Sequence, residues 1–144
     1  MVHKDFSGAE DACQACELHA TVEADEADGR CLVCLTGAGD IAAEPLWLKP
    51  DLVPVARKLV ADGLADLAGL LARWREGSVE LLHAAGELQL WARSEDNRRV
   101  LALTCGAGAV CVATATAHEL YRLLARVERY LRGNGLLAAT PAAG

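Results

Sequence analysis

The chain is poor in aromatic and basic residues and contains no long apolar run, and these shortages exclude several classes of protein. Its 144 residues carry 14 Lys and Arg against 20 Asp and Glu, a net charge of −6. Phosphates repel such an acidic surface, so general binding to DNA or RNA is disfavoured. No apolar run approaches the ~18–20 residues that span a bilayer, and no apolar segment follows Met1 to Asp5, so a secretory signal is not expected. These absences predict a cytoplasmic protein with no nucleic-acid partner and no membrane partner.

The abundant residues predict one compact domain. Aromatic residues make up only 4% of the chain and hydrophobic residues 53%, with Ala, Leu and Val dominant. A chain of this length buries about 68–70% of the surface that its unfolded form exposes, so a core can form without disulfides or metal. We expect a flexible lead-in over 1–8, a single domain over 9–133 and a flexible tail over 134–144.

The six cysteines raise the question of a metal or redox site. In a reducing cytoplasm they are expected to be thiols or metal ligands. Four of them are spaced C-x2-C, fourteen residues, C-x2-C, close to a tetracysteine zinc site: Cys13, Cys16, Cys31 and Cys34. Neither pair carries the Gly that turns backbone amides toward the sulfurs, and Cys105 and Cys111 lie in apolar strands as small hydrophobic residues. We therefore predict no metal and no other cofactor. The alternatives are a zinc-binding protein with a zinc-ribbon-like site at those four cysteines, and a thiol redox or sensor protein.

Apolar periodicity divides the chain into helices and strands. Strands are expected over 17–25, 30–36, 87–94, 99–105 and 109–115, and helices over 9–16, 51–75 and 117–132. Segment 37–50 has the composition of an irregular connection, and 79–83 fits either a strand or a frayed helix end. Cys31 and Cys34 lie three residues apart in the strand over 30–36 and should point to opposite faces, so they cannot chelate one ion together.

The helix over 51–75 is apolar around about two-thirds of its circumference, more than the ~100° stripe that covers one sheet. A second copy of the helix is the economical cover for the excess. The sequence therefore predicts a homodimer through this helix, with these interface residues: Leu52, Leu59, Leu64, Leu67, Leu71 and Trp74.

Two stretches resemble the Roadblock/LC7 family. ELQLWARSEDNRRVLALTCGAGAVCVATATAHELYRLLARVERYL, residues 87–131, is similar to the family's last three strands and closing helix in lengths, turn positions and apolar pattern. ATVEADEADGRCLVCLTG, residues 20–37, resembles its first hairpin. The resemblance implies an α+β fold, a profilin-like α/β/α sandwich with one five-stranded antiparallel sheet in the order α-β-β-α-β-β-β-α. A type III secretion chaperone or another bacterial α+β family could share this layout.

No catalytic constellation is recognisable in the sequence. The three serines, Ser7, Ser78 and Ser94, lie in no nucleophile elbow, and no phosphate-binding loop is present. We expect a non-enzymatic homodimeric scaffold or regulatory protein that binds another protein, on the composite sheet or the helix edges. The family resemblance implies a small Ras-like GTPase, regulated by such dimers, or a signalling assembly as that partner.

Overall fold

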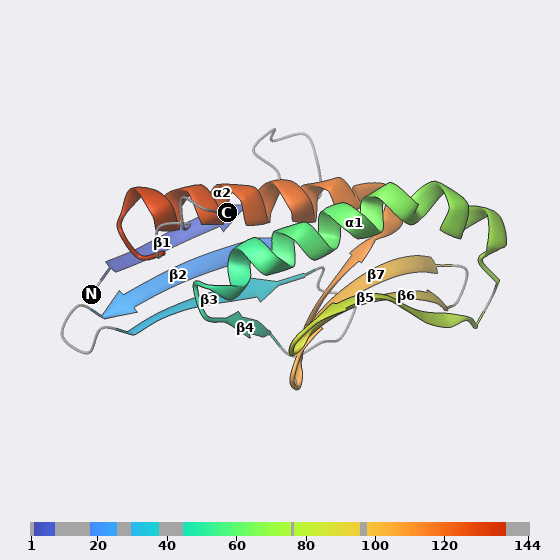
Figure 1. Ribbon diagram of the computed structural model, residues 1–144, viewed down its shortest axis with the longest axis horizontal. Coiled ribbons are helices and arrows are strands. Elements are labelled where there is room, and N and C mark those ends of the chain that lie inside the picture. Colours follow the sequence, from blue (N-terminus) through green and yellow to red (C-terminus); the bar gives the residue numbers. More distant parts are fainter. Residues whose placement is uncertain are drawn as a thin grey trace, which may run out of the picture.

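The computed structural model describes residues 2–7, 18–25, 30–37, 45–75, 77–95 and 98–137, and its strands form two antiparallel sheets (Figure 1). The first sheet has the order β1-β2-β3-β4, with β1 at Val2–Ser7, β2 at His19–Asp25, β3 at Arg30–Thr36 and β4 at Leu46–Leu48. The second has the order β5-β6-β7-β8, with β5 at Val79–Ala85, β6 at Leu88–Glu95, β7 at Arg98–Cys105 and β8 at Gly108–Ala113. Helix α1 covers Leu52–Arg73, and a 3-10 turn at Thr114–Thr116 leads into helix α2, Ala117–Gly133.

The predicted single five-stranded sheet is wrong, although the α+β class is confirmed. Three strands that the prediction lacked account for the difference: β1 in the expected lead-in, β4 in the expected irregular connection, and β5 in the ambiguous segment before residue 86. Because β4 pairs with β3, it occupies the sheet edge at which the later strands would have joined. The 22 residues of α1 then carry the chain about 33 Å onward, at 1.5 Å per residue, so the later strands form a sheet of their own.

The elements with the clearest periodicity lie where the sequence predicts them. The strand expected over 30–36 is β3, those over 87–94 and 99–105 are β6 and β7 within one residue at each end, and the helix over 117–132 is α2. The helix expected over 9–16 lies outside the described residues. Leu136 and Leu137 of the expected tail pack against the core, and residues 138–144 lie outside the described part. Neither described helix combines the length and apolar character needed to cross a membrane.

Both helices lie on the same side of the strands, as Figure 1 shows, and the core fills the space between the two layers. Along each strand, alternate residues point toward the helices because successive side chains of a strand point to opposite faces. Leu90, Leu103 and Val110 are neighbours across β6, β7 and β8, and all three are fully buried. From α2, the stripe Leu120, Leu124 and Val127 packs into the same core, as its helical spacing predicts.

Two glycines allow the sheets to meet closely. A Cβ at Gly37, just after β3, would lie 2.6 Å from the carbonyl oxygen of Cys111 in β8. A Cβ at Gly108, the first residue of β8, would lie 2.4 Å from the carbonyl oxygen of Pro45, just before β4. Backbone therefore packs on backbone at this joint, and no larger residue fits without moving one sheet from the other.

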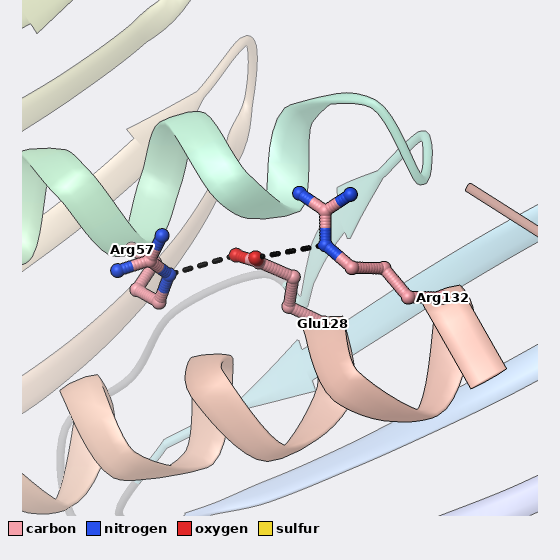
Figure 2. A network of polar contacts seen from close by, with 3 residues as sticks. All are labelled: Arg57, Glu128 and Arg132. Carbon is pink, nitrogen blue, oxygen red and sulfur yellow. Dashed lines mark hydrogen bonds and ion pairs between the residues drawn. The ribbon is translucent and has the colours of Figure 1, made fainter. Parts of the chain in front are cut away.

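A polar network joins α1 to α2 on the side away from the sheets (Figure 2). Arg57 Nε donates to Glu128 Oε1 at 2.7 Å, and Arg132 Nε donates to Glu128 Oε2 at 3.2 Å. Burial by itself raises the pKa of the Glu128 carboxyl, but the hydrogen bonds from Arg57 and Arg132 outweigh it and hold that pKa below its ordinary value. The hydrogen bond with Glu128 raises the pKa of Arg57, so both partners remain charged at neutral pH.

Candidate functional site

The two sheets present a second face on which no described helix packs, called the open face from here on. Cross-strand partners lie on the same face of a sheet. In the second sheet, the row that crosses β5 to β8 on this face consists of Leu81, Trp91, Ala102 and Cys111. In the first sheet, the open face carries Leu32 opposite Glu23, and Trp47 opposite Cys34.

Every large hydrophobic side chain that is exposed among the described residues belongs to the open face. They are Leu32 and Trp47 in the first sheet, and Val79 and Leu81 in the second. The side chains retain 43% of their accessible surface at Leu32 and Leu81, 50% at Trp47 and 61% at Val79. A single exposed apolar side chain is ordinary, whereas several on one face are typical of interaction surfaces.

Trp91 extends the apolar surface from the sheet edge toward its centre. This half-buried side chain packs against Val100, Ala102 and Cys111 on the neighbouring strands. Its indole Nε1 donates to Gln89 Oε1 at 3.2 Å, so its polar end is satisfied within the face.

A buried donor lies beside this apolar surface. Arg93, next to Val79 in the sheet register, has its Nε buried with no hydrogen-bond partner among the described residues. A buried donor without an acceptor costs about 1–3 kcal/mol. A docking molecule that supplies an acceptor at Arg93 would remove that cost.

The structure places Cys31 and Cys34 on opposite faces of β3, as the sequence predicts. Cys31 pairs across the strands with the buried Ala24, whereas Cys34 pairs with Trp47 on the open face. They can neither hold one zinc ion together nor form a disulfide with each other, because their side chains diverge. Cys13 and Cys16 lie outside the described residues. Within the described residues, no group of three or more His, Cys, Asp or Glu could hold a metal ion.

The described thiols lack the features of reactive cysteines. Burial raises the pKa of Cys31, Cys34, Cys105 and Cys111, and at Cys34 the nearby Glu23 carboxylate adds to the effect. A redox-active cysteine needs a lowered pKa, because the thiolate is the nucleophile. A redox role for these four thiols therefore finds no support in their surroundings.

The residues predicted to form the dimer seam along α1 lie in or beside the core. Leu59 and Trp74 are buried, and Leu52, Leu64 and Leu67 are half-buried against the core. The side chain of Leu71 lies outside the described residues. The apolar face of the helix is broad because the helix packs against α2, β5 and β6 of its own chain simultaneously. The excess apolar surface that favoured a seam on α1 therefore has an explanation within a single chain.

Sequence reasoning missed the open face, although a signal for it is present. In the strand over 30–36, Cys31 to Leu35 are apolar without interruption, whereas a strand with one solvated face alternates. An uninterrupted apolar strand in an antiparallel sheet predicts that both of its faces are covered.

No protein-family model matches the chain, and the comparison with curated proteins finds no significant match. Membership of the Roadblock/LC7 family and a small GTPase as partner therefore stay predictions that rest on the sequence resemblance.

Proposed function

We propose that this protein is a non-enzymatic scaffold that acts by binding protein through its open face, and that a second copy of the chain is its first partner there. One observation carries the proposal: all four exposed large hydrophobic side chains of the described residues gather on that face. Covering what remains exposed of such a side chain contributes about 1 kcal/mol, at roughly 25 cal/mol for each Å² removed from water.

The charges on the open face favour a two-fold arrangement that sets the first sheet of one copy over the second sheet of the other. Asp5 and Glu23 carry negative charge on the outer side of the first sheet, whereas Arg93 lies on the outer side of the second. In the crossed arrangement, the carboxylates of each copy approach Arg93 of its partner. A two-fold axis repeats this contact, so the interface is self-complementary.

The experiment is sedimentation equilibrium at micromolar concentration. We expect a molecular mass of about twice the 15.2 kDa of one chain, which corresponds to a dimer. Trp47→Ser and Leu81→Ser should each weaken the dimer about fivefold or more, since each change removes one apolar contact from both halves of the interface. A wild-type chain that stays monomeric and soluble throughout this range refutes the proposal.

A matched control separates the open face from the earlier predicted seam on α1. Ala68 is exposed on α1 about one turn from both Leu64 and Leu71 of that seam, so Ala68→Asp places a charge beside the seam without disturbing the core. The dimer should survive this change. Loss of the dimer in the Ala68 variant, with no loss in the Leu81 variant, would move the interface to α1.

Mixing two variants tests the crossed geometry. If the first sheet of each copy meets the second sheet of the other, a mixture of the Trp47 and Leu81 variants forms a heterodimer in which one half of the interface is wholly wild type. The mixture should therefore associate more tightly than either variant alone. Equal or weaker association would show that like sheets meet like sheets.

A further inference from the structure

A second surface, separate from the open face, lies between β1 and the C-terminal half of α2. It is a cleft of about 530 Å³. Its walls come from the two ends of the described chain: Lys4, Asp5 and Phe6 from β1, and Arg126, Arg129 and Tyr130 from α2. Its volume lies in the range of about 300–1,000 Å³ that ligand sites in proteins occupy.

The cleft concentrates positive charge on a chain whose net charge is −6. Lys4, Arg126 and Arg129 line it, and among the described residues no carboxylate is paired with Lys4 or Arg129. Arg129 differs in this from Arg57 and Arg132, which bind Glu128, and from Arg122, which binds Glu119.

The one acidic residue of the cleft does not neutralise these cations. The carboxylate of Asp5 lies 3.0 Å from His3 Nε2. Both side chains belong to the outer side of the sheet, because Asp5 pairs with Thr21 and His3 with Glu23. Lys4 and Phe6 alternate with them and point toward α2. The cations and the carboxylate therefore lie on different sides of β1.

The cleft follows the free edge of a strand. Three consecutive residues of β1 line it, and consecutive side chains of a strand point to opposite faces, so the cleft runs along the strand's edge rather than over one face. Among the described strands, β1 is the terminal strand of its sheet, and its backbone pairs with β2 alone. The aromatic rings of Phe6 and Tyr130, packed edge to face with centroids 5.6 Å apart, form the apolar part of the wall.

We propose that this cleft binds an extended acidic peptide as an additional strand on the free edge of β1. The backbone groups of β1 that pair with no described strand hydrogen-bond the peptide main chain, as in other cases of strand addition. Every second side chain of the peptide then points toward α2, where Lys4 and Arg129 donate charge-assisted hydrogen bonds to the peptide carboxylates. This site lies along the edge of β1 beside α2 and does not depend on the open face.

Fluorescence anisotropy with the labelled peptide Glu-Val-Glu-Val-Glu-Val-Glu tests the proposal on the full chain. Arg129→Ala should weaken binding about fivefold, as expected for the loss of an ion pair near the surface. Arg122→Ala is the matched control, because it removes the same charge from the same helix outside the cleft. Equal effects of the two substitutions would show general attraction to the helix and would refute the site.

A second variant tests the shape of the cleft without changing any charge. Gly133 lines the cleft, and a Cβ added there meets no atom within 4 Å. Gly133→Leu should fold normally, occupy part of the cleft and lower peptide affinity. Unchanged affinity in this variant would place the peptide elsewhere.

Two further ligands separate strand addition from plain anion binding. A peptide of the same sequence with N-methylated valines keeps every carboxylate but loses main-chain donors, and it should bind at least several-fold more weakly. Glutarate and inorganic phosphate should compete only at far higher concentration than the peptide. Equal binding of the methylated peptide, or competition by glutarate at peptide-like concentration, would reduce the cleft to a small-anion site and overturn the proposal.

Discussion

Removal of the Glu128 carboxylate is expected to loosen the contact between the two helices. The side chain of Glu128 is only 13% exposed and binds two guanidinium groups, Arg57 at 2.7 Å and Arg132 at 3.2 Å. In Glu128→Gln the shape is retained but the charge is lost, and an amide N–H₂ must face a guanidinium.

The size of the effect follows from the exposure of the partners. A hydrogen bond to a charged group contributes about 1.5–3 kcal/mol. Arg57 and Arg132 remain 33% and 39% exposed, so water partly replaces the lost carboxylate. We therefore expect a loss near the lower end, about 2 kcal/mol in the free energy of unfolding. For a chain of this length, about 2–4 °C per kcal/mol gives a fall in Tm of about 4–8 °C.

Thermal unfolding followed by circular dichroism measures this difference, with Glu119→Gln as the control. In the part of the chain that the structure describes, Glu119 binds only Arg122, whose side chain is 68% exposed, so its loss should cost no more than about 0.5 kcal/mol. A double-mutant cycle with Arg57→Ala isolates the coupling between the helices. A coupling energy below about 0.5 kcal/mol, or equal effects at Glu128 and Glu119, would refute a stabilising role for the network.

Three further outcomes follow from the structure. The Tm difference between wild type and the Glu128 variant should be constant near neutral pH and shrink as the pH falls below 4.5. A carboxyl whose pKa is lowered by folding loses its contribution to stability as it is protonated. A Tm difference that grows in acid would contradict a lowered pKa of Glu128 in the folded chain. Gly108→Ala should cost about 2 kcal/mol or more by chemical denaturation, because its Cβ would meet the carbonyl oxygen of Pro45, whereas Gly133→Ala should cost nothing. Cys31 and Cys34 should alkylate slowly at neutral pH and form no disulfide with each other under mild oxidation, as peptide mass mapping can check.

The periodic segments show how much of the fold is determined locally. β3 has the predicted bounds, and β6, β7 and α2 have nearly the predicted bounds, because a strand or helix with a marked apolar period needs only its own residues to define its buried side. The divergence of Cys31 and Cys34 was predictable for the same reason, since it follows from the two-residue period of a strand.

The sheet arrangement and both candidate sites were decided by contacts between distant segments. The three residues of β4 are too few for a periodic signal, yet their pairing with β3 closes the first sheet and leaves the later strands to form a second. The burial of Leu59 and Trp74 depends on α1 meeting α2, β5 and β6 together, which the helix sequence alone cannot reveal. Lys4 and Arg129 share a cleft although 124 positions separate them. An apolar period tells which side of a segment is buried, whereas the partner that buries it is chosen only when the whole chain packs.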